Sequence, residues 1–274
     1  MKRDHTGRPS GSTDTADAAP GAAREPSIEL TALSKRFGDK LAVDGLDLEI
    51  GRGEFFCFLG PNGAGKTTTI KMMTGLVRPT AGSVRIAGFD AQLEPLEARR
   101  RLGYVPDTPF LYDKLTGREF LRFVAGLYRM EEARARELAG HYLELFEVDR
   151  VADQLIENYS HGMRQKLSFA ACFLHEPEVV VVDEPWVGLD PKNIHRVKRF
   201  LRRQADEEGL TVFMSTHTLS IAEEIADRIG IIRSGRLLRL GSVDDIKRLA
   251  RRPGTLEDVF LELTEEEEEE AAPA

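Results

Sequence analysis

One nine-residue segment, Gly60–Thr68, constrains this chain more than any other, because its sequence GPNGAGKTT fits the phosphate-binding pattern G-x-x-x-x-G-K-[ST]. The apolar run Phe55–Leu59 predicts a buried strand before it, and residues 68–77 favour a helix after it. Three glycines, Gly60, Gly63 and Gly65, let successive backbone N–H groups point inward. The nest that they form, together with the positive end of the following helix dipole, attracts phosphates. We therefore expect nucleotide phosphates to bind at Gly60, Pro61, Asn62, Gly63, Ala64, Gly65, Lys66, Thr67 and Thr68.

Two side chains of this loop have separate chemical roles. Lys66 would reach the β- and γ-phosphates as a point charge, and the Thr67 hydroxyl would complete the ligand shell of a bound Mg²⁺. The alternative is a glycine-rich turn that matches by chance, for which the odds are on the order of one in a hundred in a chain of this length. The motif alone is strong but not decisive.

The length of 274 residues allows one large domain or two small ones. The formal charge is −8, but the run Glu265–Glu270 carries six negative charges, so the rest of the chain is near neutral and no nucleic-acid partner is indicated.

Cys57 and Cys172 lie in apolar stretches and are predicted to be buried thiols rather than a disulfide or a reactive site. No apolar run reaches the roughly 18 residues that span a bilayer, so we expect a cytoplasmic protein.

The first part of the chain combines a tail with a pair of strands. Residues 1–26 are rich in Gly, Ser, Thr, Ala and Pro and are predicted to be a disordered tail. Residues 27–33 and 41–50 read as strands, and residues 35–40 read as the turn between them. Phe37, on that turn, either stacks on the adenine of a bound nucleotide or joins a local apolar cluster.

The middle of the chain changes to helical character. Prolines predict an extended loop over residues 102–109. Thr116 and Glu119 form a capping-box pattern that opens a helix, and residues 131–147 carry apolar positions at helical spacing. We expect a helical insert at about residues 110–165.

A run of four valines is closed by two carboxylates, Asp183 and Glu184. A continuous β-branched run is typical of a strand buried on both faces of a parallel sheet, and ligands bind at the carboxyl ends of such strands. Asp183 would hold Mg²⁺ and Glu184 would polarise the attacking water as general base, whereas the alternative is that both cap a turn. His217 follows another predicted strand, residues 210–214. The alternative to a role in the site is that His217 is an ordinary surface loop residue.

The order of these segments resembles that of the ATP-binding subunit of an ABC transporter, from about residue 27 to residue 264. The matching positions are the aromatic Phe37, the Walker A loop, the glutamine-loop position Asp107, the signature Tyr159–Met163, the Walker B carboxylates, the D-loop Gly188–Asp190 and the switch histidine His217. The resemblance implies an α/β fold: a P-loop ATPase core with a mostly parallel sheet, an antiparallel β subdomain and an inserted α-helical subdomain. It divides the chain into a nucleotide-binding domain at 27–240, a C-terminal helical extension at 241–264 and an acidic tail at 265–274.

The same resemblance implies ATP and Mg²⁺ as cofactors and assigns roles to further residues. Glu184, His217 and Lys66 would be catalytic, with His217 holding the γ-phosphate and the water in line. Other nucleotide contacts would come from Phe37, Ser160, Gly162 and Asp190, and the metal would be held by Thr67, Asp107 and Asp183. Asp107 departs from the family pattern, because a carboxylate replaces the usual glutamine and cannot donate a hydrogen bond.

The helical insert, the Ser-His-Gly-Met form of the signature and the ending at residues 255–264 resemble the ATPase subunits of bacterial drug and lipid exporters. The partners implied are integral membrane permease subunits and a second nucleotide-binding subunit, in a homodimer or a heterodimer, with the chain on the inner face of the membrane. A soluble ABC ATPase of translation or DNA repair is the alternative. A P-loop kinase or GTPase would leave the signature and His217 unexplained.

Overall fold

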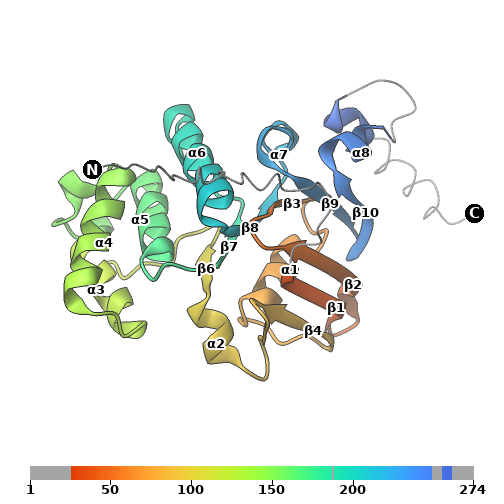
Figure 1. Cartoon of the computed structure of the whole chain (residues 1–274), viewed down its shortest axis with the longest axis horizontal. Helices are drawn as coiled ribbons and strands as arrows, with labels where there is room; N and C mark the ends of the chain where they lie inside the picture. The colour runs from red at the N-terminus through yellow and green to blue at the C-terminus, as the bar shows by residue number, and fades with distance from the viewer. Residues whose placement is uncertain (1–25, 187, 249–254, 261–274) are drawn as a thin grey trace, which may run out of the picture.

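The computed structural model describes residues 26–186, 188–248 and 255–260, and it has two β-sheets with helices beside them (Figure 1). The disordered tail and the acidic tail predicted from the sequence lie outside these residues, except that Pro26 begins the first strand. The elements in chain order are β1 Pro26–Phe37, β2 Lys40–Gly51, β3 Phe55–Leu59, α1 Lys66–Met73, β4 Ala81–Ile86, β5 Phe89–Asp90, α2 Pro95–Arg100, β6 Leu102–Val105, α3 Gly117–Leu127, α4 Glu132–Leu145, the 3₁₀ turns Asp149–Val151 and Ile156–Asn158, α5 His161–Phe173, β7 Val179–Asp183, α6 Pro191–Glu208, β8 Thr211–Thr216, α7 Leu219–Ile225, β9 Arg228–Arg233, β10 Arg236–Ser242 and α8 Val243–Lys247.

The two sheets differ in strand direction. The four-stranded sheet has the order β2-β1-β4-β5, and its paired strands are antiparallel. The six-stranded sheet has the order β10-β9-β3-β8-β7-β6, and only the pair of β10 and β9 is antiparallel. The prediction of a mostly parallel core sheet with an antiparallel β subdomain is therefore confirmed.

The central strands are buried on both faces, as their unbroken apolar sequences predict. All five residues of β3 and all five of β7 are buried. Because side chains alternate across a strand, Phe55, Cys57 and Leu59 enter one apolar cluster while Phe56 and Phe58 enter the other. This double burial fixes β3 and β7 firmly, so the loops at their carboxyl ends start from rigid positions.

Three helices, α3, α4 and α5, lie together at one end of the molecule (Figure 1). The capping box at the start of α3 is present: Glu119 N–H donates to Thr116 Oγ1 at 3.2 Å, and Thr116 N–H donates to Glu119 Oε2 at 2.8 Å. The C-terminal boundary predicted for the insert, residue 165, lies within α5, which continues to Phe173. The insert as a separate unit stays a prediction.

Two local predictions were wrong. Residues 102–109 do not form a loop throughout, because Leu102–Val105 is strand β6, paired parallel with β7. Pro106 ends that strand, since proline has no N–H to donate to a ladder. Phe37 does not lie on a turn but ends β1 opposite Lys40, and Gly38, with a φ of 55°, makes the tight connection.

Within the helical extension predicted at residues 241–264, Val243–Lys247 is helix α8 and residues 256–260 are helical. Residues 249–254 and 261–264 of that extension lie outside the described part. Across the described segments, none of the helices has the length and apolar character needed to cross a bilayer.

Candidate nucleotide-binding and hydrolysis site

The loop between β3 and α1 is held by close backbone contacts that only glycine allows. A Cβ atom at Gly60 would lie 2.3 Å from the carbonyl oxygen of Ile232, and one at Gly65 would lie 2.7 Å from that of Ala42. Gly65 also has a φ of 114°, in the region that glycine favours. The loop is therefore wedged between β2, which carries Ala42, and β9, which carries Ile232, and it leads directly into α1.

A cavity of about 320 Å³ opens over this loop. It brings together ten of the residues predicted for the site, namely Phe37, Pro61, Asn62, Gly63, Gly65, Lys66, Thr67, Thr68, Asp107 and Glu184. Lys40 and Ala42 also line it, and the sequence interpretation missed both. Phe37 is half-exposed at the cavity, and Lys35 Nζ lies 4.9 Å from the centre of its ring. A flat ring at the rim can stack on a nucleotide base.

Lys66 carries the positive charge at the base of this cavity. Its ammonium group donates hydrogen bonds to the carbonyl oxygens of Gly60 at 2.7 Å and Pro61 at 3.3 Å. It also lies 3.6 Å from Glu184 Oε1. The side chain is buried, so its charge acts at low dielectric on any anion that enters the loop.

Asp183 lies at the end of β7 and is fully buried. Ser215 Oγ donates to Asp183 Oδ1 at 2.5 Å, while Oδ2 has no hydrogen-bond partner among the described residues. Burial raises the pKa of Asp183, and hydrogen bonds from the hydroxyls of Ser215 and Thr67 act against that rise. A buried carboxylate oxygen with no donor, beside the Thr67 hydroxyl, suits a hard cation with oxygen ligands.

Glu184 follows with a left-handed backbone, at a φ of 45°, which is rare for a residue with a Cβ atom. Its N–H donates to Ser215, to the carbonyl oxygen and to Oγ, both at 3.2 Å. The Glu184 carboxylate contacts His217: the distance between Glu184 Oε2 and His217 Nδ1 is 2.8 Å. The strained backbone thus aims Glu184 at the cavity, and His217 holds one of its oxygens.

Asp107 reaches the same cavity from the end of β6. Its Oδ1 accepts a hydrogen bond from Thr108 N–H at 2.7 Å. The neighbouring Pro106 carbonyl accepts one at 3.4 Å from Gln165 Nε2, a fully buried side chain of α5. Gln165, which the sequence interpretation missed, therefore links the Asp107 loop to the helix that carries the signature.

Five predicted nucleotide contacts do not line this cavity: Gly60 and Ala64 of the phosphate loop, and the more distant Ser160, Gly162 and Asp190. Ser160 caps α5 by accepting a hydrogen bond from Met163 N–H at 3.3 Å. Asp190 caps α6 by accepting hydrogen bonds from Asn193, which lower the pKa of its carboxyl group. A Cβ atom at Gly162 would lie 2.6 Å from the Gly188 carbonyl oxygen, so the signature helix and the D-loop touch each other.

Within the part of the chain that the structure describes, His, Cys, Asp and Glu side chains form no group of three or more that could hold a metal ion by themselves. A metal at Asp183 and Thr67 would therefore need oxygens from the nucleotide or from water. Such a partly open shell is usual for a cation that accompanies nucleotide phosphates.

Comparison with known proteins agrees with this geometry. The family model "ABC transporter" matches residues 43–187. Daunorubicin resistance ATP-binding protein DrrA3 of Streptomyces coeruleorubidus is 38% identical over 237 residues, which cover 86% of this chain and 74% of that protein. Bacitracin transport ATP-binding protein BcrA of Bacillus licheniformis is 37% identical over 225 residues, which cover 82% of this chain and 72% of that protein.

Solved structures show the same architecture. The structure of an ATP-binding subunit of an ABC transporter matches with a TM-score of 0.81 and 34% identity, over 86% of this chain and 99% of that one. The dimeric cassette MJ0796, bound to ADP and Pi in a post-hydrolysis state, matches with a TM-score of 0.73 and 27% identity, over 78% of this chain and 98% of that one. The chain belongs to the ATP-binding subunits of ABC transporters, and it is an ATPase whose hydrolysis of ATP powers transport.

Proposed function

We propose that this chain powers a drug-type exporter, as two cassettes that close on ATP beneath integral membrane permease subunits. The relatives named for daunorubicin resistance and bacitracin transport support this class over a soluble ABC ATPase. The chain would sit on the inner face of the membrane through the permease. The observation that carries the proposal is an exposed aromatic surface next to the Asp107 loop.

In the proposed chemistry, three residues act on the γ-phosphate and the attacking water. Lys66 compensates the charge of the β- and γ-phosphates, because its buried ammonium group lies at the base of the phosphate loop. Glu184 orients and polarises the water as general base, and His217 keeps its carboxylate in place through the 2.8 Å contact. Holding the water in line is a positioning task, so the geometry of this pair matters more than its proton affinity.

Thr67 and Asp183 fit a Mg²⁺ ion, which would neutralise part of the phosphate charge when bound. The support is the unpartnered Oδ2 of buried Asp183, with the Thr67 hydroxyl beside the same carboxylate. Asp107 is the third proposed ligand, because its side chain lines the cavity. This donor set is all oxygen, as Mg²⁺ prefers.

The signature requires a second chain. Ser160 and Gly162 lie at the start of α5 and do not line the cavity that holds Lys66, which supports a site shared between two chains. A two-fold dimer would place the signature of each chain against the γ-phosphate bound by the other, and the similar cassette MJ0796 was solved as a dimer. We propose that ATP joins two cassettes and that hydrolysis separates them.

The proposed permease-docking surface consists of Phe110, Tyr112, Phe123 and Leu127. Phe110 is 85% exposed and Leu127 is 65% exposed, while the rings of Tyr112 and Phe123 meet edge to face with centroids 5.2 Å apart. Clustered exposed aromatic side chains are typical of a protein interface. Phe110 follows Asp107 by three residues, so a partner bound here would act directly on the edge of the nucleotide cavity.

A pull-down tests this surface. We expect the tagged chain, purified from detergent-solubilised membranes of its source, to retain one integral membrane protein. Phe110→Glu combined with Phe123→Glu should lose that protein, whereas Leu240→Glu, which changes an exposed leucine on β10, should keep it. Equal recovery with all three proteins would contradict docking at this surface.

A further inference from the structure

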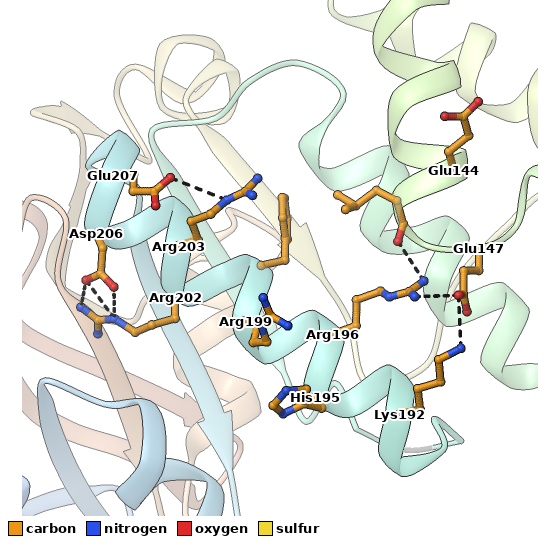
Figure 2. A pocket seen from close by; sticks show the side chains of 12 residues that line it. Glu144, Glu147, Lys192, His195, Arg196, Arg199, Arg202, Arg203, Asp206 and Glu207 are labelled. Carbon is orange, nitrogen blue, oxygen red and sulfur yellow. Dashed lines mark hydrogen bonds and ion pairs between the residues drawn. The ribbon is translucent and has the colours of Figure 1, made fainter.

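A second cavity, of about 930 Å³, lies between α4 and α6, and it shares no lining residue with the nucleotide cavity (Figure 2). Three of its arginines pair with carboxylates of the same groove, namely Arg196 with Glu147, Arg202 with Asp206 and Arg203 with Glu207. The groove therefore carries its own counter-charges and offers little net charge to a ligand.

The turn between β9 and β10, in contrast, contacts the phosphate loop directly. Gly235 N–H donates a hydrogen bond to the carbonyl oxygen of Ala64 at 2.9 Å. Ala64 is buried and does not line the nucleotide cavity, whereas the next residue, Gly65, does line it. The turn therefore supports the phosphate loop from its buried side.

This hydrogen bond fixes the direction of one peptide group. The Ala64 carbonyl and the Gly65 N–H belong to the same planar trans peptide, so they point in opposite directions. Because Gly235 holds the carbonyl on the buried side, the Gly65 N–H faces the side on which Gly65 lines the cavity. Within the described part of the chain, this N–H donates no hydrogen bond. A backbone N–H that is available at the start of a helix suits a phosphate oxygen.

Contacts with β2 hold the turn itself in place. Asp44 N–H donates to the Gly235 carbonyl oxygen at 2.9 Å, and Arg236 Nη2 lies 2.6 Å from Asp44 Oδ2. Gly235 has a φ of 82°, and a Cβ atom there would lie 2.9 Å from the Ala42 carbonyl oxygen. The turn is thus packed closely against β2, and only glycine fits at its second position.

We propose that Gly235 is a positioning residue for ATP binding, which holds the Ala64–Gly65 peptide with the Gly65 N–H directed at the nucleotide phosphates. Arg236 and Asp44 act one step further away, by holding the turn against β2. The inference rests on the proposed role of the phosphate loop. Hydrogen bonds to charged groups are stronger than those between neutral groups, so losing the alignment of one N–H should weaken ATP binding about tenfold.

Steady-state ATPase kinetics of two matched glycine variants test the proposal. Gly88, between β4 and β5, has the same φ of 82°, but a Cβ atom there would meet nothing within 4 Å. Gly235→Ala and Gly88→Ala therefore carry similar backbone strain, and only Gly235→Ala displaces the turn. Gly235→Ala should raise the KM for ATP about tenfold with kcat within about twofold of the parent, because Lys66, Glu184 and His217 are unchanged. Gly88→Ala should keep the parent KM.

This split between KM and kcat distinguishes positioning from general destabilisation. A variant that is merely less stable has a smaller active fraction, which lowers kcat and leaves KM unchanged. The proposal is overturned if folded Gly235→Ala keeps the parent KM, if it loses kcat alone, or if Gly88→Ala raises KM equally. Lys66→Ala, assayed alongside, separates the two levels: full activity in that variant rejects the phosphate loop itself, not only its support.

A second pair of variants decides the question if Gly235→Ala does not fold. Arg236→Ala removes an exposed ion pair and should raise the KM for ATP about threefold by loosening the turn. Arg239→Ala is its control, because Arg239 is an exposed arginine of the same strand that donates to the neighbouring Leu238 carbonyl oxygen. Equal KM values in these two variants would overturn the proposal.

Discussion

Ser215 is the residue through which the two carboxylates of the site are held together, so removing its hydroxyl tests the site directly. Ser215 Oγ donates to Asp183 Oδ1 at 2.5 Å and accepts from Glu184 N–H at 3.2 Å. A hydrogen bond to a charged group contributes about 1.5–3 kcal/mol. Because each 1.36 kcal/mol is a factor of ten, Ser215→Ala should lower kcat/KM roughly 10- to 100-fold.

The pH profile gives a second, independent readout of the same change. Burial raises the pKa of Asp183 and the Ser215 hydroxyl lowers it, so loss of the hydroxyl raises the pKa further. The ionised form is then lost at a higher pH as the solution is acidified, and the acid limb of ATPase activity should move to higher pH. Thr211→Val, at the other end of β8, is the matched control because it removes a buried hydroxyl far from both carboxylates. A Ser215→Ala protein with the parent rate and the parent acid limb would refute the reasoning.

Three further predictions concern Lys66 and Asp107 of the site and the partly buried His175. Lys66→Ala should abolish ATP hydrolysis while the circular dichroism spectrum stays that of the parent; unchanged turnover would reject the phosphate-loop assignment. Asp107→Ala should raise the Mg²⁺ concentration needed for half-maximal ATPase, and Asp107→Gln should restore it; equal Mg²⁺ dependence in all three proteins would place Asp107 outside the metal shell. Burial lowers the pKa of His175 to about 4, so the unfolded chain binds more protons than the folded one below pH 6.5. Stability should therefore fall by about 2 kcal/mol between pH 7 and pH 5 from this group alone. His175→Gln should remove that part of the loss in urea melts at the two pH values, and an identical loss in both proteins would count against it.

The elements predicted correctly are those whose signal is local in sequence. Five apolar residues in a row identified β3, four valines identified β7, and the capping box identified the start of α3. Strand β6 was missed because its four residues have no strong pattern of their own. Its pairing with β7, which begins with Leu102 opposite Val179, comes from the rest of the sheet.

The same distinction applies to the site. The phosphate loop, Asp183 and Glu184 could be identified from sequence motifs. Ser215 could not, because it reaches the site through the pairing of β8 with β7, in a register that sets it opposite Asp183. A polar residue at the end of a buried strand, beside the strand that ends in a carboxylate, is the signal that could have found it. Gln165 has no comparable signal, because its contact with the Pro106 carbonyl depends on how α5 packs against β6.

The resemblance also implied a second nucleotide-binding subunit. It places Ser160 and Gly162 in the same functional site as Lys66, with each motif supplied by a different chain. The structure puts them outside the cavity, at the start of α5 beside the D-loop. The proposed dimer resolves this, because a second chain supplies the missing side of the site.

The central claim, that ATP is bound between two copies of the cassette, is tested most directly by sedimentation of the Glu184→Gln protein. The amide keeps the shape of Glu184 but cannot act as the base, so ATP should bind and persist. The account predicts a monomer with ADP and a dimer with saturating ATP and Mg²⁺, and it predicts that adding Ser160→Arg returns the protein to a monomer. A Glu184→Gln protein that stays monomeric at saturating ATP would contradict the self-paired site.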